Sequence, residues 1–169
     1  IPYTIKASID FDSAGVKIDS PVVYFGSRNE DSLKMLKTFA KGFKKTGKDV
    51  EKAFDVAMET QNLFYDRCIE EGKKLFSSIG KNDKVMVVTG RPYNSVDPGA
   101  NMNIHKKLID LGVIPVPLDM LPVMDGAQDD EDLKDMYWGY GQKILRAAKF
   151  VKKRDNYYGI YITNFGCGP

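Results

Sequence analysis

Cysteine and histidine are scarce in this chain of 169 residues, which contains two cysteines, Cys68 and Cys167, and one histidine, His105. Two cysteines cannot form a disulfide framework, so the composition favours a reducing compartment. The sequence also lacks a Cys-x-x-Cys pair, a Gly-x-Ser-x-Gly motif and a phosphate-binding glycine loop ending in Lys-Ser or Lys-Thr. His105 has no evident triad partners, and a packing role for it is favoured. These absences disfavour the common self-contained enzyme classes.

Long apolar segments and an excess of one charge are also missing. No stretch of about eighteen apolar residues occurs, and the N-terminus lacks the basic-then-apolar layout of a secretion signal. We therefore expect no membrane span and a cytoplasmic location. Lysine and arginine total 25 against 23 acidic residues, which argues against a nucleic-acid partner. The hydrophobic content of 43% is enough for a folded core.

Residues 1–80 predict edge strands followed by helices. Tyr3–Ala7 and Val22–Phe25 have the composition of two extended segments that would pair at a sheet edge. A helix is predicted from Asn29 to Gly47, and a longer one from Asp49 to Ser78, with apolar residues on one stripe that would be buried. Cys68 lies on that stripe, where a small buried hydrophobic residue is the ordinary interpretation.

Residues 81–169 predict an alternation of strands and helices. The apolar run Lys84–Thr89 is typical of a strand covered on both faces. The later elements predicted are a helix from Pro98 to Leu111 with Asp97 as its N-cap, a strand Val113–Val116, a helix Glu131–Val151 with Leu133, Tyr137, Tyr140, Ile144 and Phe150 inward, and a strand Tyr158–Thr163. The expected fold is α/β: a three-layer Rossmann-like core with a parallel βαβαβ sheet, preceded by edge strands and a two-helix segment, in one compact domain cut from a longer protein.

Right-handed crossovers would make the three strands parallel, so the loops after them, at 90–94, 119–122 and 164–169, would meet at one sheet edge. Several polar residues there are candidates for binding a ligand or cofactor. Arg91 could pair with an anion or bridge to Asp119. Tyr93 and Asn94 could orient a ligand or serve only as turn residues. The remaining candidates are Asp97, at a predicted helix start where free amides could receive an anion, and Asn164.

Cys167 is the candidate metal ligand. It lies between Gly166 and Gly168 just after the last predicted strand, so no neighbouring side chain crowds its thiol. An iron–sulfur cluster usually needs about four protein thiolates. We therefore expect the other ligands to come from outside these residues, and no cluster in this segment alone.

Four segments occur in an order that resembles a known family: Val88–Asn94, Asp97–Gly99, Leu118–Pro122 and Thr163–Pro169. They are similar to the accessory domain of large CoA-substrate-specific enzyme activases, the activator-related proteins of the 2-hydroxyacyl-CoA (2-hydroxyglutaryl-CoA) dehydratase system. The resemblance covers mainly residues 84–169, and the helical half matches only in general layout.

The resemblance implies participation in ATP-driven, low-potential electron transfer to an iron–sulfur partner. The family's ATP-binding domains would lie outside this chain, and its partners would be other domains of the same polypeptide and a dehydratase or iron–sulfur protein. Cys167 is the one cluster-ligand position that carries over from the related dehydratase subunits. Arg91, Asn94 and Asp119 match family motifs and would line the shared cleft.

Two alternatives stay open at the level of the sequence. One is a module that binds a small anion, such as a CoA or nucleotide portion, through Arg91 and the predicted helix start at Pro98. The other is a structural connector, in which the edge loops dock neighbouring domains and Cys167 is buried on assembly.

Overall fold

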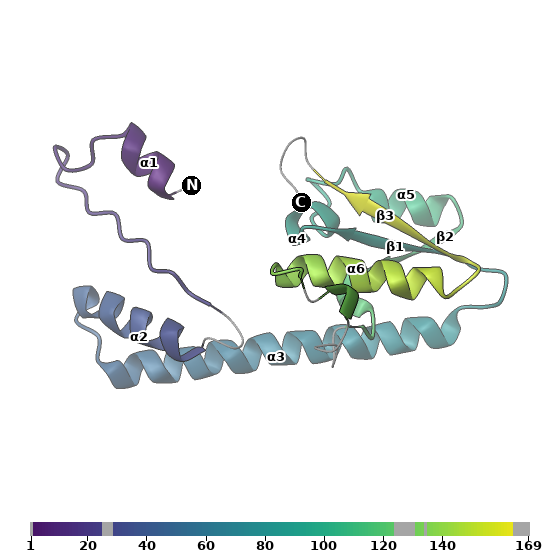
Figure 1. The fold of residues 1–169 in the computed structure, drawn as a ribbon, viewed down its shortest axis with the longest axis horizontal. Coiled ribbons are helices and arrows are strands. Elements are labelled where there is room, and N and C mark those ends of the chain that lie inside the picture. The colour runs from purple at the N-terminus through teal and green to yellow at the C-terminus, as the bar shows by residue number, and fades with distance from the viewer. Residues whose placement is uncertain (1, 25–28, 124–130, 134, 164–169) are drawn as a thin grey trace. The chain divides into compact units, whose positions relative to one another are not determined.

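The structure is a computed structural model that describes residues 2–24, 29–123, 131–133 and 135–163. The chain divides into two compact units, residues 1–62 and residues 63–169 (Figure 1). The division lies within the longest helix, α3 (Gly47–Ser78). A domain boundary between residues 80 and 81 stays a prediction.

The predicted edge strands are not present in the first unit. Pro2–Ser8 forms a helix, α1, and Val22–Tyr24 has no regular structure, while Phe25 lies outside the described residues. Proline is well suited to the first turn of a helix, because its missing N–H would have no intrahelical partner there. A short helix also pairs some of its own backbone groups, whereas a strand depends on a neighbour for all of its ladder hydrogen bonds. The alternation of apolar residues in Tyr3–Ala7 was therefore misleading.

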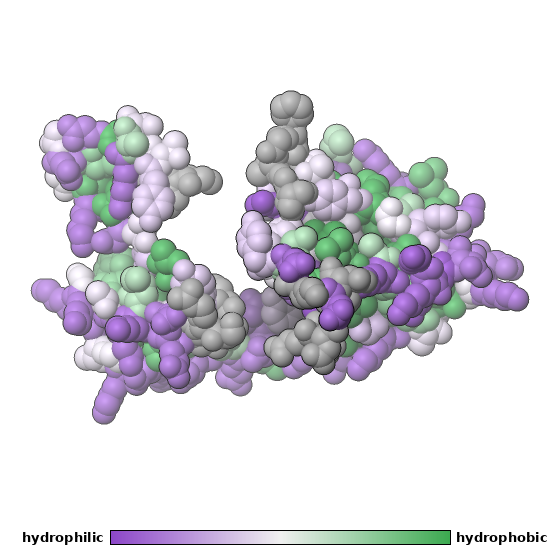
Figure 2. All heavy atoms as spheres, viewed as in Figure 1, coloured by the Kyte–Doolittle hydropathy of each residue, from purple (hydrophilic) through white to green (hydrophobic). Residues whose placement is uncertain are grey.

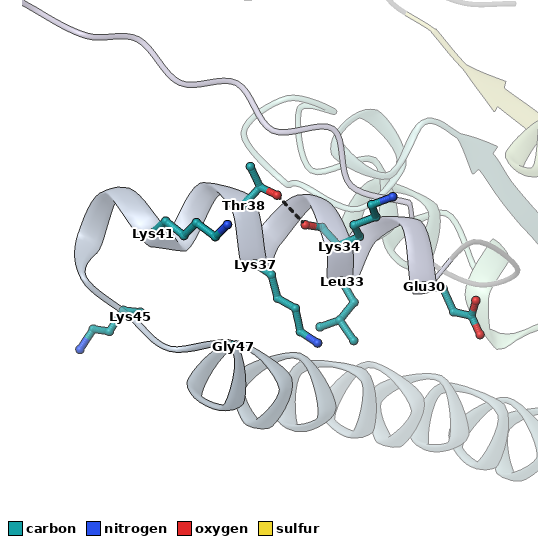
Figure 3. Close-up of a pocket in the computed structure, with 8 residues that line it drawn as sticks. All are labelled: Glu30, Leu33, Lys34, Lys37, Thr38, Lys41, Lys45 and Gly47. Carbon is teal, nitrogen blue, oxygen red and sulfur yellow. Dashed lines mark hydrogen bonds between the residues drawn. The ribbon is translucent and has the colours of Figure 1, made fainter.

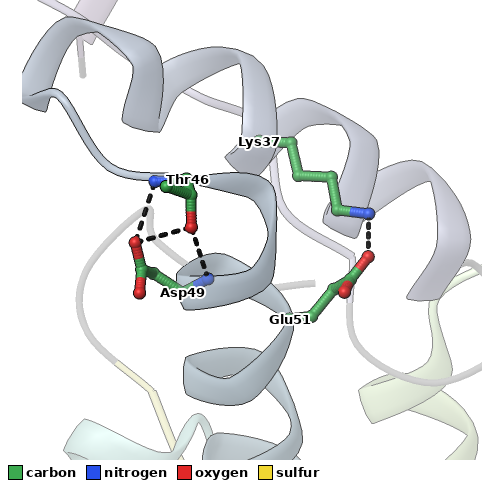
Figure 4. Close-up of polar contacts among 4 residues, drawn as sticks. All are labelled: Lys37, Thr46, Asp49 and Glu51. Carbon is green, nitrogen blue, oxygen red and sulfur yellow. Dashed lines mark hydrogen bonds and ion pairs between the residues drawn. The ribbon is translucent and has the colours of Figure 1, made fainter.

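Two helices form a hairpin in the first unit: α2 (Asn29–Ala40), extended by the 3-10 turn η1 (Lys41–Phe43), and the first part of α3. Lys44 has a left-handed conformation, with φ 56°, and ends the first arm. Thr46 and Asp49 then cap α3 reciprocally (Figure 4): Thr46 N–H donates to Asp49 Oδ2 over 2.9 Å, and Asp49 N–H donates to Thr46 Oγ1 over 3.2 Å. An ion pair between Lys37 and Glu51 ties the two arms together.

Helix α3 confirms the prediction of a helix ending at Ser78, but its apolar stripe is not buried along its whole length. Gly72 is the buried residue among those described in α3. Leu75 and Phe76 pack against the core, whereas Phe64 is 52% exposed. The long face predicted to be buried is thus covered mainly near its C-terminal end.

The second unit is built on a parallel sheet, as predicted. Its described strands are β1 (Lys84–Gly90), β2 (Val113–Pro117) and β3 (Tyr157–Ile162), in the order β2-β1-β3. β1 pairs with both neighbours in parallel. Its central position explains why Val85, Val87 and Val88 are fully buried. The nearly unbroken apolar run of β1 correctly indicated a strand covered on both faces.

Helices lie on both sides of this sheet (Figure 1). The chain moves one way from β1 to β2 and back past β1 to reach β3, so right-handed crossovers place the two connecting helices on opposite faces. α5 (Ile104–Asp110) covers one face, and α6 (Gly139–Lys152) covers the other. Ring contacts of Phe76 and Phe150 with each other and with Tyr157, at 5.7–6.4 Å between centroids, join α3, α6 and β3. The three-layer α/β prediction is confirmed.

The helix predicted from Pro98 to Leu111 begins later than expected, at Ile104, and a short helix stands where a loop was predicted over Gly90–Asn94. A short helix α4 (Pro92–Ser95) follows β1 directly, and turns separate it from α5. Met102 and Asn103 have positive φ angles of 54° and 57°, which interrupt a right-handed helix. Asp97 does not cap a helix at Pro98. Its Oδ1 accepts the Ala100 N–H over 2.8 Å and builds a turn.

The helix predicted over Glu131–Val151 is also shorter than expected. Glu131–Leu133 forms a 3-10 turn, η3, and α6 begins at Gly139. Trp138 is extended, with ψ 106°, and so ends the irregular segment before α6. Leu133 and Phe150 are buried as predicted, but Tyr137 was wrongly expected to face inward: it lies before α6 and is 98% exposed.

Candidate functional site at the carboxyl edge of the sheet

The carboxyl ends of the three strands lie in register. Gly90 at the end of β1 pairs with Ile162 at the end of β3, and Val88 pairs with Pro117 at the end of β2. The loops that follow therefore leave from one edge, as predicted. The chain passes from β1 to β2 on one side and then to β3 on the other side of β1. The order in which strands are added to the sheet therefore reverses at β1, and the topological switch point lies between β1 and β3. Ligands of open α/β sheets bind at such a switch point.

Gly90 sets how closely the first loop approaches the third strand. Its φ is +145°, and a Cβ on it would lie 2.3 Å from the Ile162 carbonyl oxygen. Only glycine fits both this conformation and this spacing. Gly90 therefore holds Arg91, the next residue, beside the end of β3.

The Arg91 side chain is held against an aromatic ring. Its guanidinium carbon lies 5.7 Å from the centroid of the Trp138 ring, within the range of a cation–π contact. Arg91 Nε is buried and has no hydrogen-bond partner within the described residues. No salt bridge joins Arg91 to Asp119 in that part of the chain, so the predicted bridge between them is not formed there.

Asn94 is the most unusual residue of the edge. It lies in α4, and its side chain is 1% exposed. Neither its Oδ1 nor its Nδ2 has a hydrogen-bond partner in the portion that the structure describes. A buried amide without partners costs folding free energy, so native proteins rarely keep one. The prediction that Asn94 serves only as a turn residue does not account for this burial.

The turn around Asn94 is well supported. Ser95, 2% exposed, donates from Oγ to the Arg91 carbonyl over 3.2 Å. The Ser95 carbonyl accepts from Asn101 Nδ2 over 3.2 Å and pairs with His105 Nε2 over 2.6 Å. Since a carbonyl only accepts, Nε2 carries the proton. His105 therefore has the half-buried structural role that the sequence favoured, and it helps to fix α4.

A second group of polar side chains surrounds Asp119, which lies in the 3-10 turn η2 (Leu118–Met120) after β2. α3 comes very close to this turn, because a Cβ on Gly72 would lie 2.0 Å from the Met120 carbonyl oxygen. The half-buried Lys143 of α6 has its Nζ 4.9 Å from the Tyr65 ring centroid and 5.7 Å from the Tyr140 ring centroid. Tyr65, Cys68, Tyr140 and Lys143 all interact electrostatically with Asp119.

These surroundings favour the uncharged forms of Tyr65, Cys68, Tyr140 and Lys143. Burial, assisted by the Asp119 charge, raises the pKa of Tyr140 to about 12 and raises the pKa of Tyr65 and of the Cys68 thiol. The nearby Ser95 hydroxyl lowers the pKa of Tyr140 slightly, but Tyr140 has no hydrogen bond of its own within the described ranges. Burial lowers the pKa of Lys143, and Asp119 opposes that shift. The Asp119 carboxyl thus lies near the Tyr65 and Tyr140 phenols, the Cys68 thiol and the Lys143 amine.

The predicted residues divide into three sets. Arg91, Asn94 and Asp119 lie at the carboxyl edge. Tyr93, 45% exposed, and Asp97, also exposed, lie on the outside of the loop after β1. Asn164 and Cys167 lie outside the described residues. Cys68 is a free, half-buried thiol, so the interpretation as a fully buried core residue holds only in part.

Sequence reasoning missed Tyr65, Trp138 and Lys143. Tyr140 was expected to be inward, and this was right in part, since it packs against the core. The missed residues belong to helices that converge through tertiary packing, and no local motif marks them. The single tryptophan, next to glycine-rich Gly139-Tyr140-Gly141, was the available signal.

Two pockets of the first unit differ from this edge in the residues that line them. One lies beside α2, and half of its lining residues are lysines (Figure 3): Glu30, Leu33, Lys34, Lys37, Thr38, Lys41, Lys45 and Gly47. The other is an apolar groove of about 530 Å³ between the hairpin arms, lined by residues that include Leu36, Phe39, Val50 and Phe54. Neither contains a buried polar side chain without a partner among the described residues.

The described residues contain neither a metal-ligand group nor a membrane-spanning helix. In residues 2–24, 29–123, 131–133 and 135–163, no group of three or more histidine, cysteine, aspartate or glutamate side chains could hold a metal ion. No helix in these ranges is both long and apolar enough to cross a bilayer.

The fold and the edge define an open α/β domain with polar side chains at the carboxyl ends of its parallel strands. Residues 1–121 match the family described as "CoA enzyme activase uncharacterised domain", and the chain belongs to this family. No curated protein and no solved structure matches the chain. The family match includes the helical half, which the motifs alone had matched only in layout, and extends to Leu121 at the carboxyl edge.

Proposed function

We propose that this domain acts within an ATP-dependent activator of the 2-hydroxyacyl-CoA dehydratase type and contributes to an iron–sulfur electron-transfer site. Membership of the CoA enzyme activase family supports the activator role. ATP would be bound by domains outside this chain, in keeping with the lack of a phosphate-binding glycine loop in the sequence.

Cys167 is the residue proposed to contact the cluster, which would supply one-electron transfer. The observation that carries this proposal is the parallel register of β1 and β3, which end together at Gly90 and Ile162. The chain leaves β3 at the edge that also holds Arg91 and Asn94, and Cys167 is the fifth residue after Ile162 in the sequence. The glycines on either side of Cys167 leave its thiol uncrowded.

The described residues do not by themselves fit a cluster, because they provide no ligand set. Cys68 is poorly suited to ligation, since burial raises the pKa of its thiol and ligation needs the thiolate. We therefore propose that Cys167 provides one ligand and that other domains or a partner protein provide the rest.

The test uses the full-length protein, expressed and purified without oxygen. Iron, acid-labile sulfide and the electron paramagnetic resonance spectrum after reduction are measured for the native protein and for Cys167→Ser. Cys68→Ser is the matched control. We expect Cys167→Ser to lose or alter the cluster signal and Cys68→Ser to keep it. An unchanged spectrum and iron content in Cys167→Ser would refute the proposed role of Cys167.

A further inference from the structure

The end of β1 carries a concentration of buried polar atoms without partners. Arg91 Nε, both side-chain polar atoms of Asn94 and the Tyr140 hydroxyl are buried and unpaired within the described part of the chain. They belong to one neighbourhood. The Asn94 N–H donates to the Arg91 carbonyl over 2.8 Å, the Arg91 guanidinium contacts the Trp138 ring, and the Trp138 and Tyr140 ring centroids are 5.9 Å apart.

Burying these groups without hydrogen-bond partners costs folding free energy, and apolar residues at these positions would avoid that cost. An apolar side chain such as valine, which is only somewhat larger than asparagine, would leave no polar atom unpaired at position 94. Buried polar groups without protein partners typically occur at binding sites, because the ligand supplies the missing hydrogen bonds. The switch point between β1 and β3 is also where an open α/β sheet binds ligands.

The unpaired atoms specify the chemistry of the ligand. Asn94 offers one acceptor and a donor side by side, which a secondary amide matches with its own N–H and C=O. Arg91 offers a charged N–H, which a phosphate or carboxylate oxygen accepts. The Tyr140 hydroxyl can donate as well as accept.

We propose that Arg91, Asn94 and Tyr140 form a binding site for a small molecule that joins a secondary amide to a phosphate or carboxylate group. Asn94 pairs with the amide, and Arg91 pairs with the anion. The site goes beyond the proposed electron-transfer role and requires neither iron nor ATP, so it can fail or succeed independently of that role.

Trp138 makes the site directly observable, because it is the single tryptophan of the chain and contacts Arg91. We would titrate the 169-residue chain with 4′-phosphopantetheine, which carries both groups, and follow the Trp138 fluorescence and the heat of binding. Pantetheine tests the amide without the anion, and inorganic phosphate tests the anion without the amide. We expect 4′-phosphopantetheine to bind at least about tenfold more tightly than either partial probe.

Variants assign the binding to this site. Asn94→Val and Arg91→Gln are each expected to weaken binding of 4′-phosphopantetheine by about tenfold or more. Asn62→Ala and Arg67→Gln change the same residue types at exposed positions of α3 and are expected to leave binding unchanged.

Stability provides a second readout that separates a binding residue from a structural one. Because Asn94 has no described partner to lose, Asn94→Val is expected to raise the melting temperature of the free chain by about 2–4 °C. The variant should therefore be more stable and bind less well.

Three results would overturn the proposal. The first is no binding of 4′-phosphopantetheine, or equal binding by native chain and edge variants. The second is inorganic phosphate binding as tightly as the complete probe, which would remove the amide from the recognition. The third is a lower melting temperature of Asn94→Val, which would mean that water or protein already satisfies the amide.

Discussion

The two units of this protein differ sharply in what they bury. Every buried hydrophobic residue among those described lies in the second unit, for example Val87, Leu118 and Phe150, whereas Ser32 is the one buried residue described in the first. The first unit exposes large apolar side chains, including Tyr3 and Phe43, and Figure 2 shows hydrophobic residues of this unit at the surface among hydrophilic ones. Helices satisfy their backbone locally and can form with little core, but a polar site needs side chains fixed by packing. The comparison therefore assigns the candidate site to the second unit.

Gly90→Ala gives the largest expected effect on this comparison. The new Cβ would meet the Ile162 carbonyl at 2.3 Å in a backbone conformation that alanine avoids. We expect the free energy of unfolding of the second unit to fall by about 3 kcal/mol or more, measured by chemical denaturation. Gly159→Ala in β3 is the control, because nothing lies within 4 Å of its added Cβ. Equal stability of the two variants would contradict the close approach at the sheet edge.

Phe150→Ala and Phe43→Ala compare the two units directly. Phe150 is 9% exposed and contacts Phe76 and Tyr157, so truncating it should cost about 3–5 kcal/mol. Phe43 is 61% exposed, and its truncation should cost about 1 kcal/mol or less. Thermal melting followed by circular dichroism measures both. Similar losses would show that the first unit has a core of its own.

A third prediction concerns alkaline pH. The folded protein holds the Tyr140 proton up to a pKa of about 12, whereas the unfolded chain releases it near the ordinary tyrosine pKa of 10.0. Stability should therefore fall as the pH rises from about 10 toward about 12. Ultraviolet absorbance of tyrosinate should show one late ionisation that Tyr140→Phe removes. Tyr137→Phe, at a position that is 98% exposed, should leave that late ionisation in place.

The smallest expected effect is on thiol reactivity. Burial and, to a lesser extent, the Asp119 charge raise the pKa of Cys68, so this thiol should react with an alkylating reagent more slowly than Cys167, whose flanking glycines leave it uncrowded. Mass spectrometry of timed samples measures both rates. Asp119→Asn should speed the labelling of Cys68 by about twofold. Equal labelling of both cysteines in the native protein would contradict the half-buried placement of Cys68.

Features set by local sequence patterns could be predicted from the sequence, whereas contacts formed by tertiary packing could not. The strand β1 was recognisable because a central parallel strand must be apolar on both faces, and α3 because its stripe keeps one period over many turns. Their order was enough to predict a parallel sheet and the edge at which Arg91, Asn94 and Asp119 lie.

Predictions failed where the backbone leaves the regular pattern. The left-handed Met102 and Asn103 divide α4 from α5, and only glycine or asparagine gives a hint of such a conformation in a sequence. Tyr65 and Lys143 reach the site because Gly72 lets α3 approach Met120. That approach joins residues distant in the chain, so no spacing of motifs could have indicated it.

The central claim is that function lies at the carboxyl edge of the second unit and not in the helical hairpin. The most direct test is the rate of the proposed ATP-dependent electron transfer from the full-length protein to the iron–sulfur partner that we propose for it, compared for Arg91→Gln at the edge and Lys37→Gln in α2. We expect Arg91→Gln to slow transfer by about tenfold or more and Lys37→Gln to leave it within about twofold. A larger loss from Lys37→Gln than from Arg91→Gln would contradict the claim.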